Sequence, residues 1–76
     1  MNNHRRKAIT ELMHTIDCVQ RTVDDLKAQE SSYQNAVPEA LQAGRMYEAS
    51  AEAVDALESA VDLLSQAYDS LQEALG

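Results

Sequence analysis

The chain has 76 residues, which is enough for a single domain. Its net charge of −7 disfavours direct binding to a nucleic-acid backbone or an anionic membrane, and its single cysteine excludes an internal disulfide. No apolar run approaches the roughly 20 residues that a membrane-spanning helix needs, so we expect a cytoplasmic protein.

The segment over about residues 5–33 predicts a first helix. Its apolar residues recur at alternating steps of three and four, the spacing that keeps one side of a helix apolar. In heptad notation the a positions are Ile9, Ile16 and Val23, and the d positions are Leu12, Val19 and Leu26. This pattern is typical of a helix that packs along another helix.

Residues 34–44 predict a connector. Pro38 cannot donate a hydrogen bond within a helix and pushes Val37 out of the helical region, so the first helix ends before it. Pro38 followed by Glu39 suits a first helical turn. We therefore expect one short turn over residues 38–43, with Gly44 as a break or cap.

Four consecutive heptads over residues 47–74 predict a second helix, over about residues 45–75. A core residue opens each heptad, an acid follows it, and alanine closes it. The a positions are Val54, Val61, Tyr68 and Leu75, and the d positions are Leu57, Leu64 and Leu71. A repeat of seven keeps one apolar column on one side, so this helix is also predicted to lie along a partner helix.

Together these elements predict an all-α fold, a coiled-coil-like antiparallel hairpin of two helices that spans residues 1–76 as one domain. If Tyr33 meets Tyr47 at the tip, the numbers of facing residues sum to about 80, and every a residue faces a d residue. The predicted pairs are Ile9–Leu71, Leu12–Tyr68, Ile16–Leu64, Val19–Val61, Val23–Leu57 and Leu26–Val54. The same register places Lys7 opposite Glu73, where we expect an ion pair.

The alanine column of the second helix, Ala53, Ala60, Ala67 and Ala74, predicts self-association. Small side chains allow helices to approach closely. Two helices alone form a thin core, and small scaffolds without a disulfide or a metal tend to associate. We therefore predict a homodimer in which two hairpins assemble as a four-helix bundle.

The acidic column of the second helix, Glu48, Asp55, Asp62 and Asp69, repeats about every 10.5 Å. One interpretation is a solvated surface that keeps the protein soluble. The alternative is a nucleic-acid mimic that occupies a basic groove on another protein and inhibits a host defence enzyme. The helix carries about one charge per 6 Å, against one per about 1.7 Å in duplex DNA. Mimicry therefore depends on an assembly that aligns two columns.

Residues suited to catalysis or metal binding are sparse. His14 and Cys18 are four apart and lie on one side of the first helix, where both could ligate a metal. Their heptad positions face solvent, however, and a site needs two further ligands, for which only Glu11 is near and His4 would require the N-terminus to fold back. Nothing in the pattern supplies an oxyanion hole or a Gly-rich loop for a Cys–His nucleophile. We expect no enzymatic activity, no catalytic or metal site, and no cofactor.

Three motifs occur in order along the chain: Arg5–Lys7, the connector Val37-Pro-Glu-Ala-Leu-Gln42, and Arg45-Met-Tyr-Glu48 before the acidic heptads. In this order the chain resembles, over nearly its whole length, small uncharacterised acidic helical proteins carried by bacterial phages and mobile elements. The resemblance implies an accessory role and transfers no site residue. The chain departs from it at Ala43–Gly44, where a polar helix cap is usual. We predict a non-enzymatic protein-interaction module whose partner is another protein.

Overall fold

Helix α1 spans Asn3–Ala36 in the computed structural model, which describes residues 1–42 and 44–76. The Asn2 side chain caps its start by accepting a hydrogen bond from the Arg5 amide at 2.8 Å. Val37 is extended (φ −69°, ψ 125°), as a residue before proline tends to be. The helix therefore runs beyond the predicted range 5–33 at both ends, from the Asn2 cap to the residues just before Pro38.

The connector contains one turn of 3₁₀ helix, η1, over Glu39–Leu41. It is shorter than the expected turn over 38–43, and Ala43 lies outside the described residues. Gly44 stands at the N-cap of the next helix without a side-chain cap. A Cβ at Gly44 would lie 3.2 Å from the Leu41 carbonyl oxygen, so a residue without a side chain suits this tight junction.

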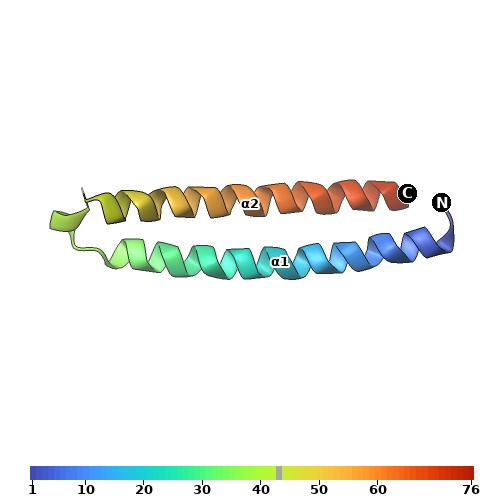
Figure 1. Ribbon diagram of the computed structural model, residues 1–76, viewed down its shortest axis with the longest axis horizontal. Coiled ribbons are helices and arrows are strands. Elements are labelled where there is room, and N and C mark those ends of the chain that lie inside the picture. Colours follow the sequence, from blue (N-terminus) through green and yellow to red (C-terminus); the bar gives the residue numbers. More distant parts are fainter. Residues whose placement is uncertain (43) are drawn as a thin grey trace.

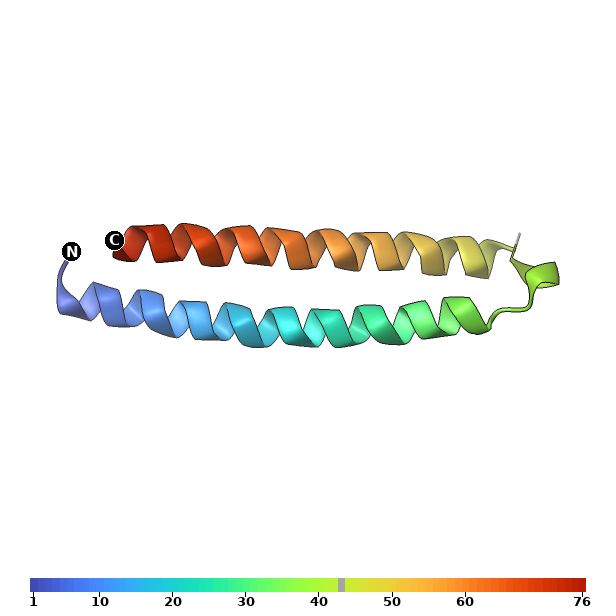
Figure 2. The same cartoon turned by 180° about the vertical axis from the view of Figure 1, so that it is seen from behind.

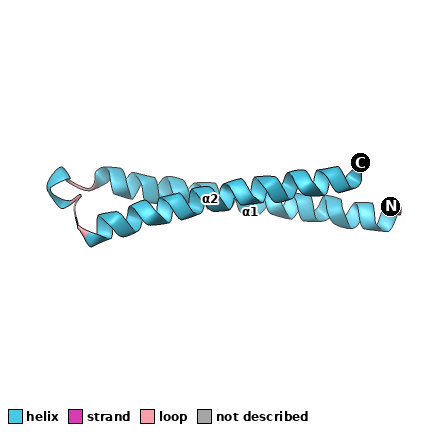
Figure 3. Cartoon of the chain, turned by 90° about the horizontal axis from the view of Figure 1, so that it is seen from above, coloured by secondary structure: helices cyan, strands magenta, loops and turns pink. Residues whose placement is uncertain are grey.

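Helix α2 spans Arg45–Leu75 and runs antiparallel to α1, so both termini lie at the end opposite the connector (Figures 1 and 2). The two helices cross at a shallow angle along their length (Figure 3). The hairpin is a rod with Cα extents of 60 × 14 × 13 Å. The predicted all-α antiparallel hairpin is confirmed, and its assembly into a four-helix bundle stays a prediction.

The hairpin has a very thin core. Among the described residues, Met13 at 8% exposure is the only buried apolar residue, and Ser50 at 4% is the only buried polar one. The chain exposes 5725 Å². A compact folded monomer of this mass, 8.4 kDa, exposes about 4,600 Å².

Neither described helix combines the length and the apolar character needed to cross a membrane.

Candidate interaction surface

The register of the two helices is defined by the polar contacts between them. Gln20 donates a hydrogen bond to the Ser65 hydroxyl at 2.8 Å and a longer one to the Val61 carbonyl oxygen at 3.5 Å. Lys27 Nζ lies 3.9 Å from a Glu58 carboxylate oxygen. The numbers of these paired residues sum to 81–85, which is at or slightly above the predicted value of about 80.

The burial of the side chains of α1 overturns part of the predicted core. The a residues Ile9, Ile16 and Val23 are half-buried, as expected, but the second interface column of α1 consists of Met13, Gln20, Lys27 and Gln34. Gln20 and Lys27 tolerate this position because their polar ends reach α2 while their aliphatic stems lie along the interface. The prediction that Leu12, Val19 and Leu26 lie in the core between the helices is therefore wrong, because these side chains are 44–53% exposed.

The d residues of α1 form an exposed apolar column instead. Leu12, Val19, Leu26 and Tyr33 are 44–53% exposed and are spaced by seven residues. At about 100° per residue, they lie about 80° around α1 from the middle of the interface with α2. Large apolar residues scattered singly over a surface are ordinary, whereas a regular row of them indicates a surface for contact.

The alanine column of α2 occupies the equivalent place on that helix. Ala53 and Ala60 are half-buried beside the interface, and Ala67 and Ala74 are exposed. One heptad earlier the column begins with Met46, which is 75% exposed, and Leu63 at 64% lies beside the column. This surface of α2 consists of the alanine column and the adjacent positions, which hold Ala49, Ala56, Leu63 and Ser70. None of these positions carries a charged residue.

The exposed column of α1 and the alanine column of α2 lie on the same side of the hairpin. Each directly precedes the corresponding interface column, and in antiparallel right-handed helices both rotations lead to the same side. The structure agrees, because Tyr33 of α1 and Met46 and Ala49 of α2 line one hollow. We call this side the apolar face: Leu12, Val19, Leu26, Tyr33, Met46, Ala53, Ala60, Leu63, Ala67 and Ala74.

The threonines that flank the apolar face on α1 are already satisfied. Thr15 donates its hydroxyl to the Glu11 carbonyl oxygen at 3.1 Å, and Thr22 does the same to that of Cys18 at 3.2 Å. A hydroxyl that is bonded to its own helix backbone can lose contact with water without being left unpaired. The flank of the apolar face is therefore also suited to being covered.

The acidic column lies elsewhere on α2. Glu48, Asp55, Asp62 and Asp69 are all exposed and sit about 140° around the helix from the alanine column. Among the residues that the structure describes, the ion pairs are Arg21–Asp17 within α1 and Lys27–Glu58 between the helices. The expected pair of Lys7 with Glu73 is not formed.

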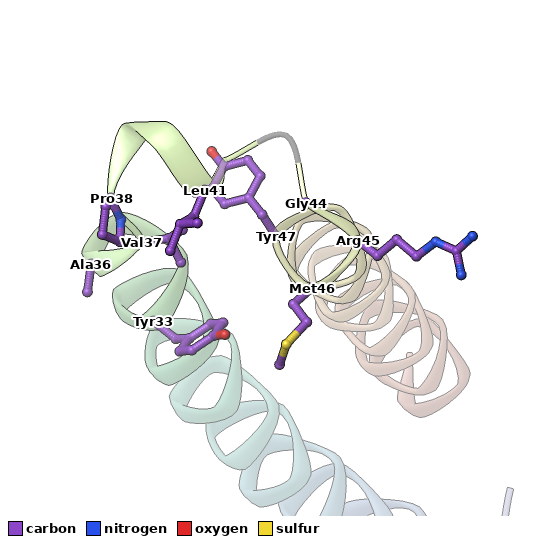
Figure 4. A pocket seen from close by; sticks show the side chains of 9 residues that line it. All are labelled: Tyr33, Ala36, Val37, Pro38, Leu41, Gly44, Arg45, Met46 and Tyr47. Atoms are coloured by element: carbon purple, nitrogen blue, oxygen red, sulfur yellow. The ribbon is translucent and has the colours of Figure 1, made fainter.

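An apolar cavity of about 470 Å³ lies at the tip, where α1, η1 and α2 meet (Figure 4). Its lining residues are Tyr33, Ala36, Val37, Pro38, Leu41, Gly44, Arg45, Met46 and Tyr47. The Arg45 guanidinium points away from it, so the lining presents no charge to the interior (Figure 4). Since Tyr33 and Met46 belong to both, the cavity continues the apolar face onto the tip.

His14 and Cys18 are exposed on α1. Within the described ranges, no group of three or more histidine, cysteine, aspartate or glutamate side chains is arranged to hold a metal ion. The surface with the most distinctive chemistry is therefore the apolar face. Neither a protein-family model nor a curated protein or solved structure significantly matches this chain, so the functional argument rests on its own geometry.

Proposed function

We propose that the chain is a non-enzymatic protein-interaction module that works as a self-associated hairpin, a homodimeric four-helix bundle. The observation that supports this most directly is the apolar face. It runs along both helices on one side of the hairpin, with large apolar side chains 44–75% exposed. Such a wide apolar arc is typical of a bundle helix with two neighbours rather than of a helix with one.

The rotation of α1 supports the same proposal. Turning α1 by about 50° would bring the Leu12 column into the interface in place of the Gln20 column. An isolated hairpin would gain apolar burial by that rotation, at about 25 cal/mol per Å². The chain instead places polar residues against α2 and leaves the larger apolar column outside. This choice suits a hairpin whose outer apolar column is covered by a further helix layer.

We do not extend the proposal to nucleic-acid mimicry. Pairing through the apolar face would leave the two acidic columns on opposite outer surfaces, because each lies about 140° around α2 from the alanine column. Each surface would then keep its four acids at about 10.5 Å spacing, far sparser than duplex DNA. The acidic columns are better assigned to solubility and to contact with a basic partner protein.

The wider role that we propose is that of a cytoplasmic accessory protein of a phage or mobile element. The location is supported by the lone, exposed cysteine, which has no internal partner for a disulfide. The role is supported by the resemblance of the motif order to small acidic proteins of such elements. The bundle would present its acidic outer surfaces to a partner, and this contact would weaken as salt rises.

Sedimentation equilibrium of the untagged chain over a wide concentration range tests the self-association. We expect the apparent mass to rise reversibly with concentration, in a single transition from about 8.4 kDa to twice that value, with no larger species. A strict monomer at millimolar concentration would disprove the proposed dimer. An open-ended series of larger species would disprove a closed bundle.

A further inference from the structure

We propose that the apolar face binds a second copy of the chain so that α1 of one hairpin packs on α2 of its partner, with both tips at the same end of the bundle. This inference rests on the self-association proposed above and specifies how the two copies meet. A two-fold dimer through one face has two simple arrangements. Either the tips lie together and α1 meets α2, or the tips lie at opposite ends and each helix meets its own copy.

The amount of exposed surface matches a second copy. The hairpin exposes 5725 Å², about 1,100 Å² more than a compact monomer of its mass. A standard stable interface buries about 800 Å² on each partner. A second hairpin offers an apolar face of the same length, whereas a small ligand would cover only part of it.

Side-chain size favours packing of α1 against α2 of the partner. The exposed column of α1 is large, with Leu12, Val19, Leu26 and Tyr33, and that of α2 is mostly alanine. If each helix met its own copy, one half of the new core would hold large side chains on both sides and the other half alanines. The first half would be overpacked and the second would contain voids, both of which destabilise a core. Packing unlike columns together places large side chains against small ones.

The positions of the large and small side chains along the length of the rod also favour this arrangement. A two-fold axis parallel to the helices keeps every residue at its own height. In the observed register a residue of α1 lies level with the α2 residue for which the two numbers sum to 81–85. Val19 then lies level with the stretch of the partner's α2 between its second and third alanines, and Leu26 with the stretch between its first and second. Each large side chain can enter a hole between two alanines.

The net charges of the two helices favour the same arrangement. Helix α2 carries seven acidic residues and one basic residue, which give −6, whereas α1 carries five of each sign and is neutral. If the tips lay at opposite ends, the two strongly acidic helices would be neighbours. With the tips together, each α2 has two neutral α1 helices as neighbours, and the two acidic helices lie diagonally across the bundle. Repulsion between like charges is smaller in that arrangement.

Spin labels at the tips distinguish the two arrangements. The substitution C18S removes the exposed Cys18. A nitroxide is then attached to the cysteine introduced by A40C, since Ala40 is exposed in η1. Pulsed dipolar spectroscopy on the dimer should give a label separation of roughly 15–30 Å, from the ~8–10 Å spacing of packed helices plus the label arms. A separation near the 60 Å length of the rod would overturn the proposed arrangement.

A mixed sample provides the control. When the tip-labelled protein is mixed with one labelled through G76C at the opposite end, the distance between the two kinds of label should be near 60 Å. A short distance between the two kinds of label would also mean that the tips lie at opposite ends of the dimer. A dimer by sedimentation with a long tip separation overturns only this arrangement. A chain that sediments as a monomer overturns the self-association and this inference together.

Discussion

The substitution L26Q separates association from folding. Leu26 is 48% exposed in the hairpin, so about half of its apolar surface remains to be covered by a partner. Burying a whole leucine is worth about 2 kcal/mol, which leaves about 1 kcal/mol for the dimer contact. A glutamine amide that is covered without a hydrogen bond costs at least about 1 kcal/mol more. Each chain therefore loses about 2 kcal/mol of contact energy.

Because both copies carry the change, the dimer should be weakened by about 4 kcal/mol, or roughly 1,000-fold in Kd. The fold of the hairpin should survive, since leucine and glutamine have similar helix propensities and Leu26 is 48% exposed in the hairpin. Sedimentation equilibrium at several concentrations measures the Kd. Far-ultraviolet circular dichroism at a concentration where the wild type is monomeric measures the helix content.

The matched control is A28Q, which introduces the same side chain two residues away. Ala28 is exposed and lies about 120° around α1 from the interface with α2, away from the apolar face. Its replacement should leave the Kd within about twofold of the wild type. If L26Q associates as tightly as the wild type, or if A28Q weakens association equally, the apolar face is not the contact surface.

Two further predictions concern the hairpin itself, and a third concerns the dimer. S50A should raise the free energy of unfolding by about 1 kcal/mol in urea titrations, because the buried Ser50 hydroxyl has no hydrogen-bond partner among the described residues; a loss of stability would mean that the hydroxyl is bonded. E58Q should cost less than about 0.5 kcal/mol, and the cost should vanish at high salt, because the pair with Lys27 spans 3.9 Å and the Glu58 side chain is 58% exposed. The triple change D55N, D62N and D69N should tighten the dimer at low salt only, since about 1 M salt screens charges beyond about 3 Å; a difference that persisted in high salt would exclude charge repulsion as its cause.

The connector illustrates what a short sequence motif can predict. Pro38 requires an extended residue before it, and Val37 is extended where α1 ends. Gly44 marks the junction at which α2 begins, at Arg45. The heptads of α2 likewise place Val54, Val61 and Leu57 half-buried, as their a and d positions predict. These predictions succeed because they depend on backbone sterics and on the period of a single helix.

The apolar face could be predicted only in part. The alanine column is evident from its regular spacing, but the heptad pattern places the matching column of α1 in the core between the helices. Leu12, Val19 and Leu26 fit an a/d heptad as well as any residues in the chain, and Gln20 and Lys27 look like surface residues. The width of the apolar arc of α1 could have identified the exposed column, since Met13 extends this arc beyond the a and d columns.

The sequence by itself determined two helices, the break between them and the antiparallel hairpin, because helical periodicity and proline geometry are local properties. Only the tertiary structure decided which side of α1 faces α2. A rotation of about 50° exchanges one interface column for another without changing the heptad pattern. The balance depends on cross-helix partners such as the Gln20–Ser65 hydrogen bond at 2.8 Å, which no single-helix pattern encodes. That rotation leaves Leu12, Val19 and Leu26 at the surface, and the proposed dimer follows from it.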